Sequence, residues 1–264
     1  MQNQSYQYIY GPVYSWRLGL SLGVDPISKT EKNCNYNCVY CQLGDTLDFG
    51  TKRQEFVSTN QIVDEIKEVK DLNIDYITFS GSGEPTLAKN LGEMINEIKK
   101  ERKEKIAVIT NSSLIDRADV QDDLMNCDFV LAKLDADSEK FFSNINKPMD
   151  TINFDSVVDG LLFFKKSFKG KLALQIMFVE ENRERAEQIA EIAKKIAPDE
   201  VQINTPLRPC ATKPLTRIQM DDIKKYFTDL NVVSVYDIET KKYKPLDDEK
   251  TAYRHGNFKE SQNS

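Results

Sequence analysis

Short, nearly continuous apolar runs alternate with amphipathic stretches along the chain. Six of these runs are rich in β-branched and aromatic residues, which is typical of strands that are buried on both faces of a parallel sheet. A further run at residues 232–238 predicts one additional edge strand. The six strands are predicted over residues 21–25, 75–80, 106–110, 129–135, 171–179 and 200–204.

The stretches between these runs carry apolar residues at a spacing of three and four, which predicts amphipathic helices. Two of the helices begin with a capping box, in which Ser58 pairs with Gln61 and Thr216 pairs with Gln219. The apolar stripes are interpreted as core faces, and the five stripes begin at Ile62, Leu91, Phe154, Ala186 and Ile223.

This order of strand and helix, repeated about six times, predicts an α/β fold with parallel strands and right-handed crossovers. Six units are too few for a closed eight-fold barrel, so an open or partial barrel fits, as does a doubly wound sheet. In either fold the site is expected at the carboxyl ends of the strands. One domain is predicted over residues 1–238, followed by a polar tail over residues 239–264 that is a lid, a plug or a disordered segment.

The composition favours a soluble cytoplasmic protein without a membrane span, since 40% of its 264 residues are hydrophobic and 30% are charged. The net charge of −6, without a basic stripe, argues against strong non-specific nucleic-acid binding, although a folded RNA substrate remains open. A Ser-His-Asp triad or a His-rich zinc site would have to depend on the one histidine, His255.

Three of the five cysteines, Cys34, Cys38 and Cys41, lie in a loop predicted over residues 26–45. In the cytoplasm such clusters bind metal more often than they form disulfides. One interpretation is a structural zinc site, which would need a fourth ligand such as Cys127 or Cys210. The other is an iron–sulfur cube with one iron left open. Since electron-transfer clusters use four cysteines, a set of three favours chemistry at the cluster over a simple electron carrier.

The C-x3-C-x2-C spacing, with aromatic Tyr40 before the last cysteine, resembles the signature of radical S-adenosylmethionine (SAM) enzymes. The resemblance implies a partial (βα)6 TIM-like barrel with parallel strands. It implies a [4Fe-4S] cluster held by Cys34, Cys38 and Cys41, with SAM bound at the open iron and Tyr40 near its adenine.

Segment 79–87, FSGSGEPTL, resembles the Gly-Gly-Glu-Pro segment that contacts the methionine amino group of SAM in this family. Ser82 stands where the family has its first glycine. The resemblance therefore makes Ser82, Gly83 and Glu84 cofactor-binding candidates, because glycine lets the backbone approach a ligand and a carboxylate complements an ammonium group.

Segment 109–114, ITNSSL, resembles the family's Thr-Asn-Gly turn, with Ser112 in place of glycine and Asn111 as a polar contact. Lys133 and Asp135 end the fourth strand at the level where the family holds the ribose and carboxylate of SAM; a structural ion pair is the alternative. Gln175 is a polar residue in an otherwise apolar strand. Its side chain is expected either to point into the barrel or to be a core glutamine with satisfied hydrogen bonds.

Arg208 follows the sixth strand, where we expect it either to bind a substrate carboxylate or phosphate or only to cap a loop. The opening segment 11–26 and the NINKP segment 144–148 resemble a narrower set of stand-alone oxidoreductases that are grouped with wyosine-base formation on tRNA. Trp16 and Leu20 replace arginines of that set. Its second cluster needs three further cysteines, so this chain alone is not expected to assemble it.

The resemblance implies an enzyme that takes one electron from a flavodoxin- or ferredoxin-like donor and cleaves SAM reductively. The resulting radical would abstract hydrogen from an unidentified substrate, which is an RNA base, a small metabolite or a peptide. The protein is expected to act as a monomer without a membrane partner.

Overall fold

The computed structural model describes residues 6–50, 52–238, 241 and 243–255. Its centre is an eight-stranded sheet in the order β1-β2-β5-β6-β7-β8-β9-β10. All neighbouring pairs from β2 to β10 are parallel, and β1 pairs antiparallel with β2. The strands are β1 (Ile9–Ser15), β2 (Gly19–Val24), β5 (Tyr76–Phe79), β6 (Lys105–Thr110), β7 (Phe129–Lys133), β8 (Lys171–Met177), β9 (Glu200–Asn204) and β10 (Val232–Ser234).

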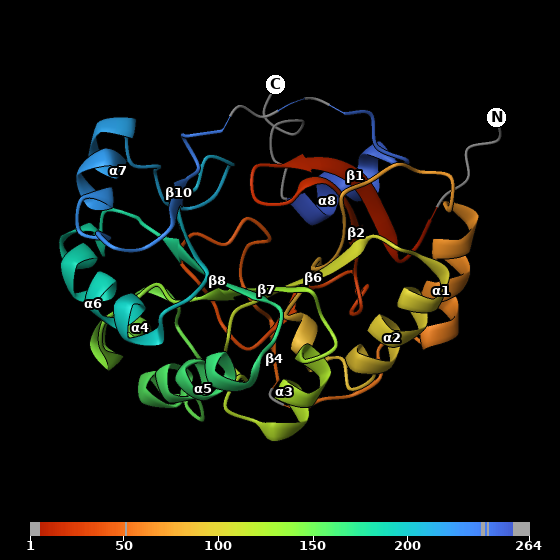
Figure 1. Cartoon of the computed structure of the whole chain (residues 1–264), viewed down its shortest axis with the longest axis horizontal. Coiled ribbons are helices and arrows are strands. Elements are labelled where there is room, and N and C mark those ends of the chain that lie inside the picture. Colours follow the sequence, from red (N-terminus) through yellow and green to blue (C-terminus); the bar gives the residue numbers. More distant parts are fainter. Residues whose placement is uncertain (1–5, 51, 239–240, 242, 256–264) are drawn as a thin grey trace.

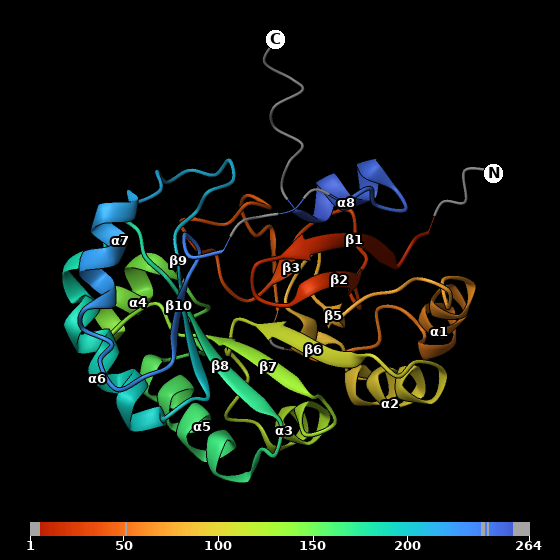
Figure 2. The same cartoon turned by 45° about the horizontal axis from the view of Figure 1, so that its top comes forward.

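Helices follow most of the parallel strands and cover the outer side of the curved sheet, as Figures 1 and 2 show. A separate two-stranded pairing joins β3 (Asn33–Cys34) to β4 (Asp48–Phe49). Two 3-10 turns, η1 (Pro85–Leu87) and η2 (Arg183–Arg185), complete the described elements. The helices are α1 (Thr59–Glu68), α2 (Leu91–Glu101), α3 (Ala118–Leu124), α4 (Glu139–Ile145), α5 (Phe154–Ser167), α6 (Ala186–Ile196), α7 (Arg217–Lys224) and α8 (Asp248–His255).

The two faces of the central strands are buried in different apolar clusters. Residues such as Val108 and Leu174 belong to the main core, together with the inner faces of the helices. Their sequence neighbours Ala107 and Ala173 form a second, smaller cluster with Phe129, Leu131 and Leu18. Since alternate residues of a strand point to opposite faces, this second cluster lies on the concave side of the sheet. Burial on both sides explains why the strands read as continuous apolar runs.

The predicted strands and the partial barrel are confirmed. Both capping boxes are present, with Ser58 and Gln61 at α1 and Thr216 and Gln219 at α7. Strand β1 was not predicted, because its sequence IYGPVYS mixes glycine, proline and tyrosine without a clear alternation. Helices α3 and α4 have only seven residues each, which is too short for a helical stripe to stand out.

The polar tail contains α8, which packs against β1 at the edge of the sheet (Figure 2). Gly11 N–H of β1 donates to Thr251 Oγ1 of α8 at 2.9 Å, and Leu246 N–H donates to the Gly11 carbonyl. The domain boundary at residue 238 stays a prediction. In the described part of the chain, every helix is too short or too polar to cross a membrane.

Candidate functional site

The cysteine loop is tied to the end of β5 by a short backbone pairing. Asn33 N–H donates to the Ser82 carbonyl and Glu84 N–H donates to the Asn33 carbonyl, each at 3.1 Å. Between these two bonds Asn33 lies directly against Gly83. A Cβ atom at Gly83 would lie 1.8 Å from the Asn33 carbonyl oxygen. Glycine is therefore required here, because only a residue without a side chain allows the strand that carries Cys34 to approach so closely.

A second tether holds the loop on its other side, along the end of α4 and the residues that follow it, 145–149. Val39 N–H donates to the Ile145 carbonyl at 2.9 Å, and Met149 N–H donates to the Asn35 carbonyl at 3.1 Å. Asn37 N–H donates to the Asn146 carbonyl at 3.0 Å. The two tethers fix the backbone around Cys34 and Cys38, so both thiols have a set place at the carboxyl edge of the sheet.

Two side-chain amides point at two of the thiols. Asn111 Nδ2 lies 3.5 Å from Cys34 Sγ, and Asn146 Nδ2 lies 3.5 Å from Cys38 Sγ. Burial raises the pKa of Cys34 to about 12, with a further contribution from the charge of Glu84. Burial also raises the pKa of Cys38 to about 11. Metals bind thiolates, so a positively charged centre and the two amide donors would have to stabilise the deprotonated form.

Buried polar atoms beside the thiols fit a bound ligand. Buried polar groups in native proteins almost always have a hydrogen-bond partner. Around the cysteine loop, several such atoms have no partner among the described residues, and these are Asn35 Nδ2, Tyr36 OH, Ser82 Oγ, Ser112 Oγ and Asn146 Oδ1. In the described part of the chain, no three His, Cys, Asp or Glu side chains form a group that could hold a single metal ion. An iron–sulfur cube binds its thiolates at separate corners, so its ligands need not converge on one point. The residues present fit such a cluster.

Glu84 ties the end of β5 to the end of β6. Its buried carboxylate accepts from Thr86 N–H at 3.0 Å, from the Thr86 and Thr110 hydroxyls at 2.8 and 2.7 Å, and from Asn111 N–H at 2.7 Å. Burial raises the pKa of Glu84, and these donors oppose that rise. The contacts make Glu84 a brace for the loop and for Asn111, while its predicted contact with the SAM ammonium group stays a prediction.

The turn after β6 has a backbone conformation that suits the glycine of the family pattern, although serine stands there. Ser112 has a φ of 68°, a left-handed conformation that favours glycine, and glycine is the residue that the family motif has there. Ser112 is fully buried in this turn, directly after Asn111.

Three predicted residues meet at the ends of the cysteine loop and β7. The Tyr40 hydroxyl donates to Asp135, and Lys133 Nζ lies 4.6 Å from the Tyr40 ring centroid and 3.9 Å from Asp135 Oδ1. Asp135 also accepts from Asn146 Nδ2 at 2.8 Å and from Met177 N–H at 2.7 Å. Asp135 thus connects the loop, β7 and β8. The predicted ion pair between Lys133 and Asp135 is present as one part of this network.

Gln175 and Arg208 lie apart from that network and line a larger cavity inside the half-barrel. Gln175, with its amide oriented to satisfy its neighbours, accepts from Arg17 Nε and Nη2 at 2.6 Å each. Arg208 Nη1 donates to Gln42 Oε1 at 3.2 Å, next to Cys41. The two residues therefore face a cavity beside the loop.

The remaining cysteines differ from each other. Cys127 is buried among the apolar side chains of the main core, so its role is packing. Cys210 is half-buried and packs with Cys38 against a small apolar cluster that contains Tyr40 and Met177. Its thiol donates to the Thr212 carbonyl at 3.2 Å.

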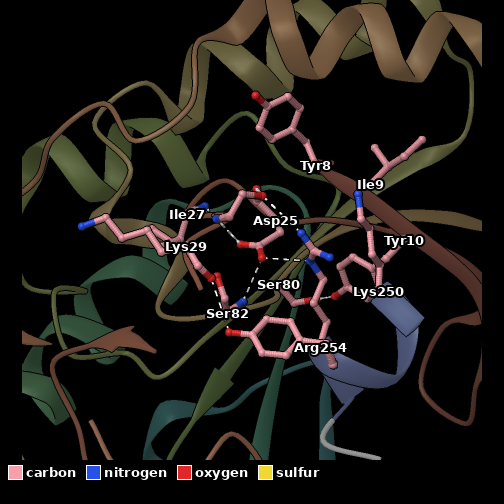
Figure 3. Close-up of polar contacts among 12 residues, drawn as sticks. Tyr8, Ile9, Tyr10, Asp25, Ile27, Lys29, Ser80, Ser82, Lys250 and Arg254 are labelled. Atoms are coloured by element: carbon pink, nitrogen blue, oxygen red, sulfur yellow. Dashed lines mark hydrogen bonds and ion pairs between the residues drawn. The ribbon is translucent and has the colours of Figure 1, made fainter. Parts of the chain in front are cut away.

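Sequence reasoning missed an ion pair between the tail and the site, drawn in Figure 3. Arg254 of α8 donates to Asp25 Oδ2 at 2.9 Å, and the two side chains are 6% and 0% exposed. The same Asp25 oxygen accepts from Ser82 N–H at 3.1 Å. A polar tail gives no sequence signal for such a long-range contact. Asn146 was also missed, although the NINKP segment that contains it was singled out.

Replacing Asn146 by alanine is expected to lower iron retention and SAM cleavage by about 10–100-fold, the usual cost of losing a hydrogen-bond partner of a metal ligand. The substitution removes the donors to Cys38 and Asp135. Asn144→Ala on the exposed side of α4 is the matched control and should leave both unchanged. Iron analysis after anaerobic reconstitution, with chromatography of the SAM products, measures the difference. Equal iron content and equal SAM cleavage in the two variants would show that Asn146 does not support the site.

Arg254→Ala is expected to lower the free energy of unfolding by about 3 kcal/mol, because it leaves the Asp25 carboxylate buried without its cation. The cost falls at the low end of the range for buried pairs, since three backbone N–H groups, those of Ile27, Ser28 and Ser82, still donate to Asp25. Urea denaturation followed by circular dichroism measures it. Arg117→Ala, which breaks an exposed ion pair with Asp119, should cost about 0–1 kcal/mol. If Arg254→Ala lowered the free energy of unfolding no more than Arg117→Ala does, the buried pair would not be important for stability.

Known proteins of similar sequence place the chain in a family. The model of the "Radical SAM superfamily" matches residues 30–193, which is more than half of the chain. The chain belongs to the radical SAM superfamily. A UPF0026 protein of Synechocystis sp., slr1464, is 40% identical over 216 residues, which is 81% of this chain and 80% of that protein. A protein of Brachyspira hyodysenteriae named GTPase Obg is 40% identical over 227 residues, and the match covers 83% of this chain but 33% of that protein.

Among solved structures, Streptococcus suis SuiB bound to precursor peptide SuiA superimposes with a TM-score of 0.63 at 14% identity. The match covers 83% of this chain and 50% of the SuiB chain, and it shows a shared fold. Radical SAM membership supports enzyme status and reductive SAM cleavage as the general chemistry, and it implies a [4Fe-4S] cluster and SAM as cofactors.

Proposed function

We propose that this radical SAM protein is an oxidoreductase in which Cys34, Cys38 and Cys41 hold the [4Fe-4S] cluster and the half-barrel cavity holds the substrate. When bound, the cluster and SAM would supply the radical chemistry that removes hydrogen from the substrate. The observation that carries the proposal is the pairing of Asn33 with Gly83, which fixes the cysteine loop beside the Ser-Gly-Glu-Pro segment.

The side chains of the site divide the remaining tasks. Asn111 and Asn146 donate to two of the thiolates and so favour their charged state. Glu84 and Asp135 hold the strand ends in register by accepting backbone and side-chain hydrogen bonds. Ser82 offers its hydroxyl, which has no partner among the described residues, and Gly83 offers its backbone to the methionine end of SAM. Tyr40, with Lys133 over its ring, borders the place proposed for the adenosine.

The electron reaches the cluster from a cytoplasmic flavodoxin- or ferredoxin-like donor. All three cysteines keep a small exposed fraction, which supports such access. The protein works as a monomer. The cavity of about 360 Å³ is within the usual size range of small-molecule pockets. A small molecule is favoured over an RNA base as substrate, because the net charge of −6 disfavours binding of a polyanion.

Anaerobic reconstitution with iron and sulfide tests the proposal. About four irons per chain are expected, and the dithionite-reduced protein should convert SAM to methionine and 5′-deoxyadenosine, which chromatography quantifies. Zinc bound in place of iron, or a stable cluster that never cleaves SAM, would contradict the proposed function.

A further inference from the structure

Asp25 joins the start of the cysteine loop to the Ser-Gly-Glu-Pro segment 82–85. It directly follows β2 and is fully buried. Its Oδ1 atom accepts from Ile27 N–H at 3.1 Å and from Ser28 N–H at 2.9 Å, where the loop begins. Its Oδ2 atom accepts from Ser82 N–H at 3.1 Å. One rigid carboxylate group therefore fixes the distance between the loop and the segment proposed to bind SAM.

Gly81 brings the backbone of this segment directly against Asp25. Its φ of 135° is a conformation that favours glycine, and a Cβ atom there would lie 2.4 Å from Asp25 Cγ. On the other side of Ser82, Gly83 pairs with Asn33 of the cysteine loop. Ser82 is therefore held between the Asp25 carboxylate and the cysteine loop.

Arg254 of α8 compensates the charge of this carboxylate. A carboxylate without exposed surface is costly unless it has a cation and hydrogen-bond donors. Arg254 Nε donates to Asp25 Oδ2 at 2.9 Å, and its Nη2 donates to the Gln7 carbonyl at 2.7 Å (Figure 3). The neighbouring Tyr253 hydroxyl donates to the Thr30 carbonyl of the cysteine loop at 2.5 Å. Helix α8 thus contacts both the carboxylate and the loop that the carboxylate holds.

We infer that Asp25 and Arg254 are positioning residues for SAM binding. Asp25 sets Ser82 and Gly83 at the distance from the cysteine loop at which they meet the methionine end of SAM, and Arg254 keeps the carboxylate in that place. This role rests on the proposed function, because SAM is the ligand that Ser82 and Gly83 are proposed to bind. Helix α8 is then required for tight SAM binding, although the three cysteines and the Ser-Gly-Glu-Pro segment all precede residue 86.

Calorimetric titration of SAM into the reconstituted, unreduced protein measures binding without cleavage, since cleavage needs an electron. Arg254→Leu should weaken SAM binding by about 10–100-fold, the range found for residues that orient the ligands of a metal centre. Its iron content should stay that of the wild type, because all three cysteines are intact. Arg254→Lys keeps a positive charge beside Asp25 and should bind SAM more tightly than Arg254→Leu does.

Arg102→Leu is the matched control for a loss of stability. The Arg102 side chain is as buried as that of Arg254, pairs with Glu104 and donates to the Val69 and Leu72 carbonyls. Arg102 lies outside the lining of the half-barrel cavity. Its replacement should destabilise the fold and leave the SAM affinity unchanged.

Hydrogen–deuterium exchange of the reconstituted protein gives a measurement that does not depend on SAM. In Arg254→Leu, the peptides that contain the amides of Ile27, Ser28 and Ser82 should exchange faster than in Arg102→Leu, because these three amides donate to Asp25. A loss of stability alone would raise exchange at these amides in both variants.

Wild-type SAM affinity in Arg254→Leu would overturn the inference, and so would an equal loss of affinity in Arg102→Leu. If Arg254→Leu does not fold, Asp25→Asn takes its place, because an amide cannot accept at both of its terminal atoms. Wild-type affinity in that variant would also overturn the inference. A wild-type protein that holds the cluster but binds no SAM would contradict the proposed function instead. The exchange at Ser82 would then still decide whether Arg254 and Asp25 hold this segment.

Discussion

Replacing Cys34, Cys38 or Cys41 singly by alanine is expected to remove the iron–sulfur cluster and to reduce SAM cleavage. Loss of a hydrogen-bond partner of a metal ligand costs about 10–100-fold, and loss of the ligand itself should cost more. Each thiolate is one of only three protein ligands in the proposed site. Iron and sulfide analysis after anaerobic reconstitution, together with the yield of 5′-deoxyadenosine, measures both effects.

The other two cysteines provide the controls. Cys127→Ala should retain iron because Cys127 is buried in the main core. Cys210→Ala is the sharper control, since Cys210 packs in the same small apolar cluster as Cys38. Retention of iron in Cys210→Ala is expected for a three-thiolate cluster. Loss of metal from this variant would instead favour a four-ligand site such as structural zinc.

Gly83→Ala is expected to disrupt the site almost as strongly without changing any ligand. The added Cβ would lie 1.8 Å from the Asn33 carbonyl oxygen, which is a backbone atom and cannot rotate away. The backbone pairing that holds Cys34 must then open, and displacements of about 1 Å at a reacting centre can cost about 100-fold in rate. SAM cleavage and iron content of the reconstituted variant measure the effect.

Gly50→Ala is the matched control, because a Cβ at Gly50 would meet no atom within 4 Å. It should behave like the wild type. If Gly83→Ala also did so, the contact between the cysteine loop and the end of β5 would not determine the position of the cluster.

The sequence predicted the parallel strands well because both of their faces are buried. Runs such as KLALQIM in β8 can be recognised without an alternation of apolar and polar residues. The capping boxes at Ser58 and Thr216 mark the starts of two helices, because their hydrogen bonds are local in sequence. Strand β1 pairs antiparallel at the edge of the sheet, and its residues carry no comparable signal. The same applies to α8, which is polar and is held by contacts with β1 that are distant in sequence.

The residues of the candidate site could be predicted where they lie together in one short motif. The spacing of Cys34, Cys38 and Cys41 and the Ser-Gly-Glu-Pro segment can be read directly from the chain. Interactions between segments could not be read in this way. Asp25 binds Arg254 across 229 positions, and Asn146 reaches Cys38 across 108 positions. The contact of Glu84 with the SAM ammonium group stays a prediction. The structure adds the protein donors from which this carboxylate accepts, and a single sequence does not reveal them.

The electron paramagnetic resonance spectrum of the reduced, reconstituted protein, recorded with and without SAM, tests the central claim most directly. If three thiolates hold a [4Fe-4S] cluster with one iron open to SAM, the signal of the reduced cluster will shift when SAM is added. An identical spectrum in both samples, or no iron–sulfur signal at all, would contradict the account.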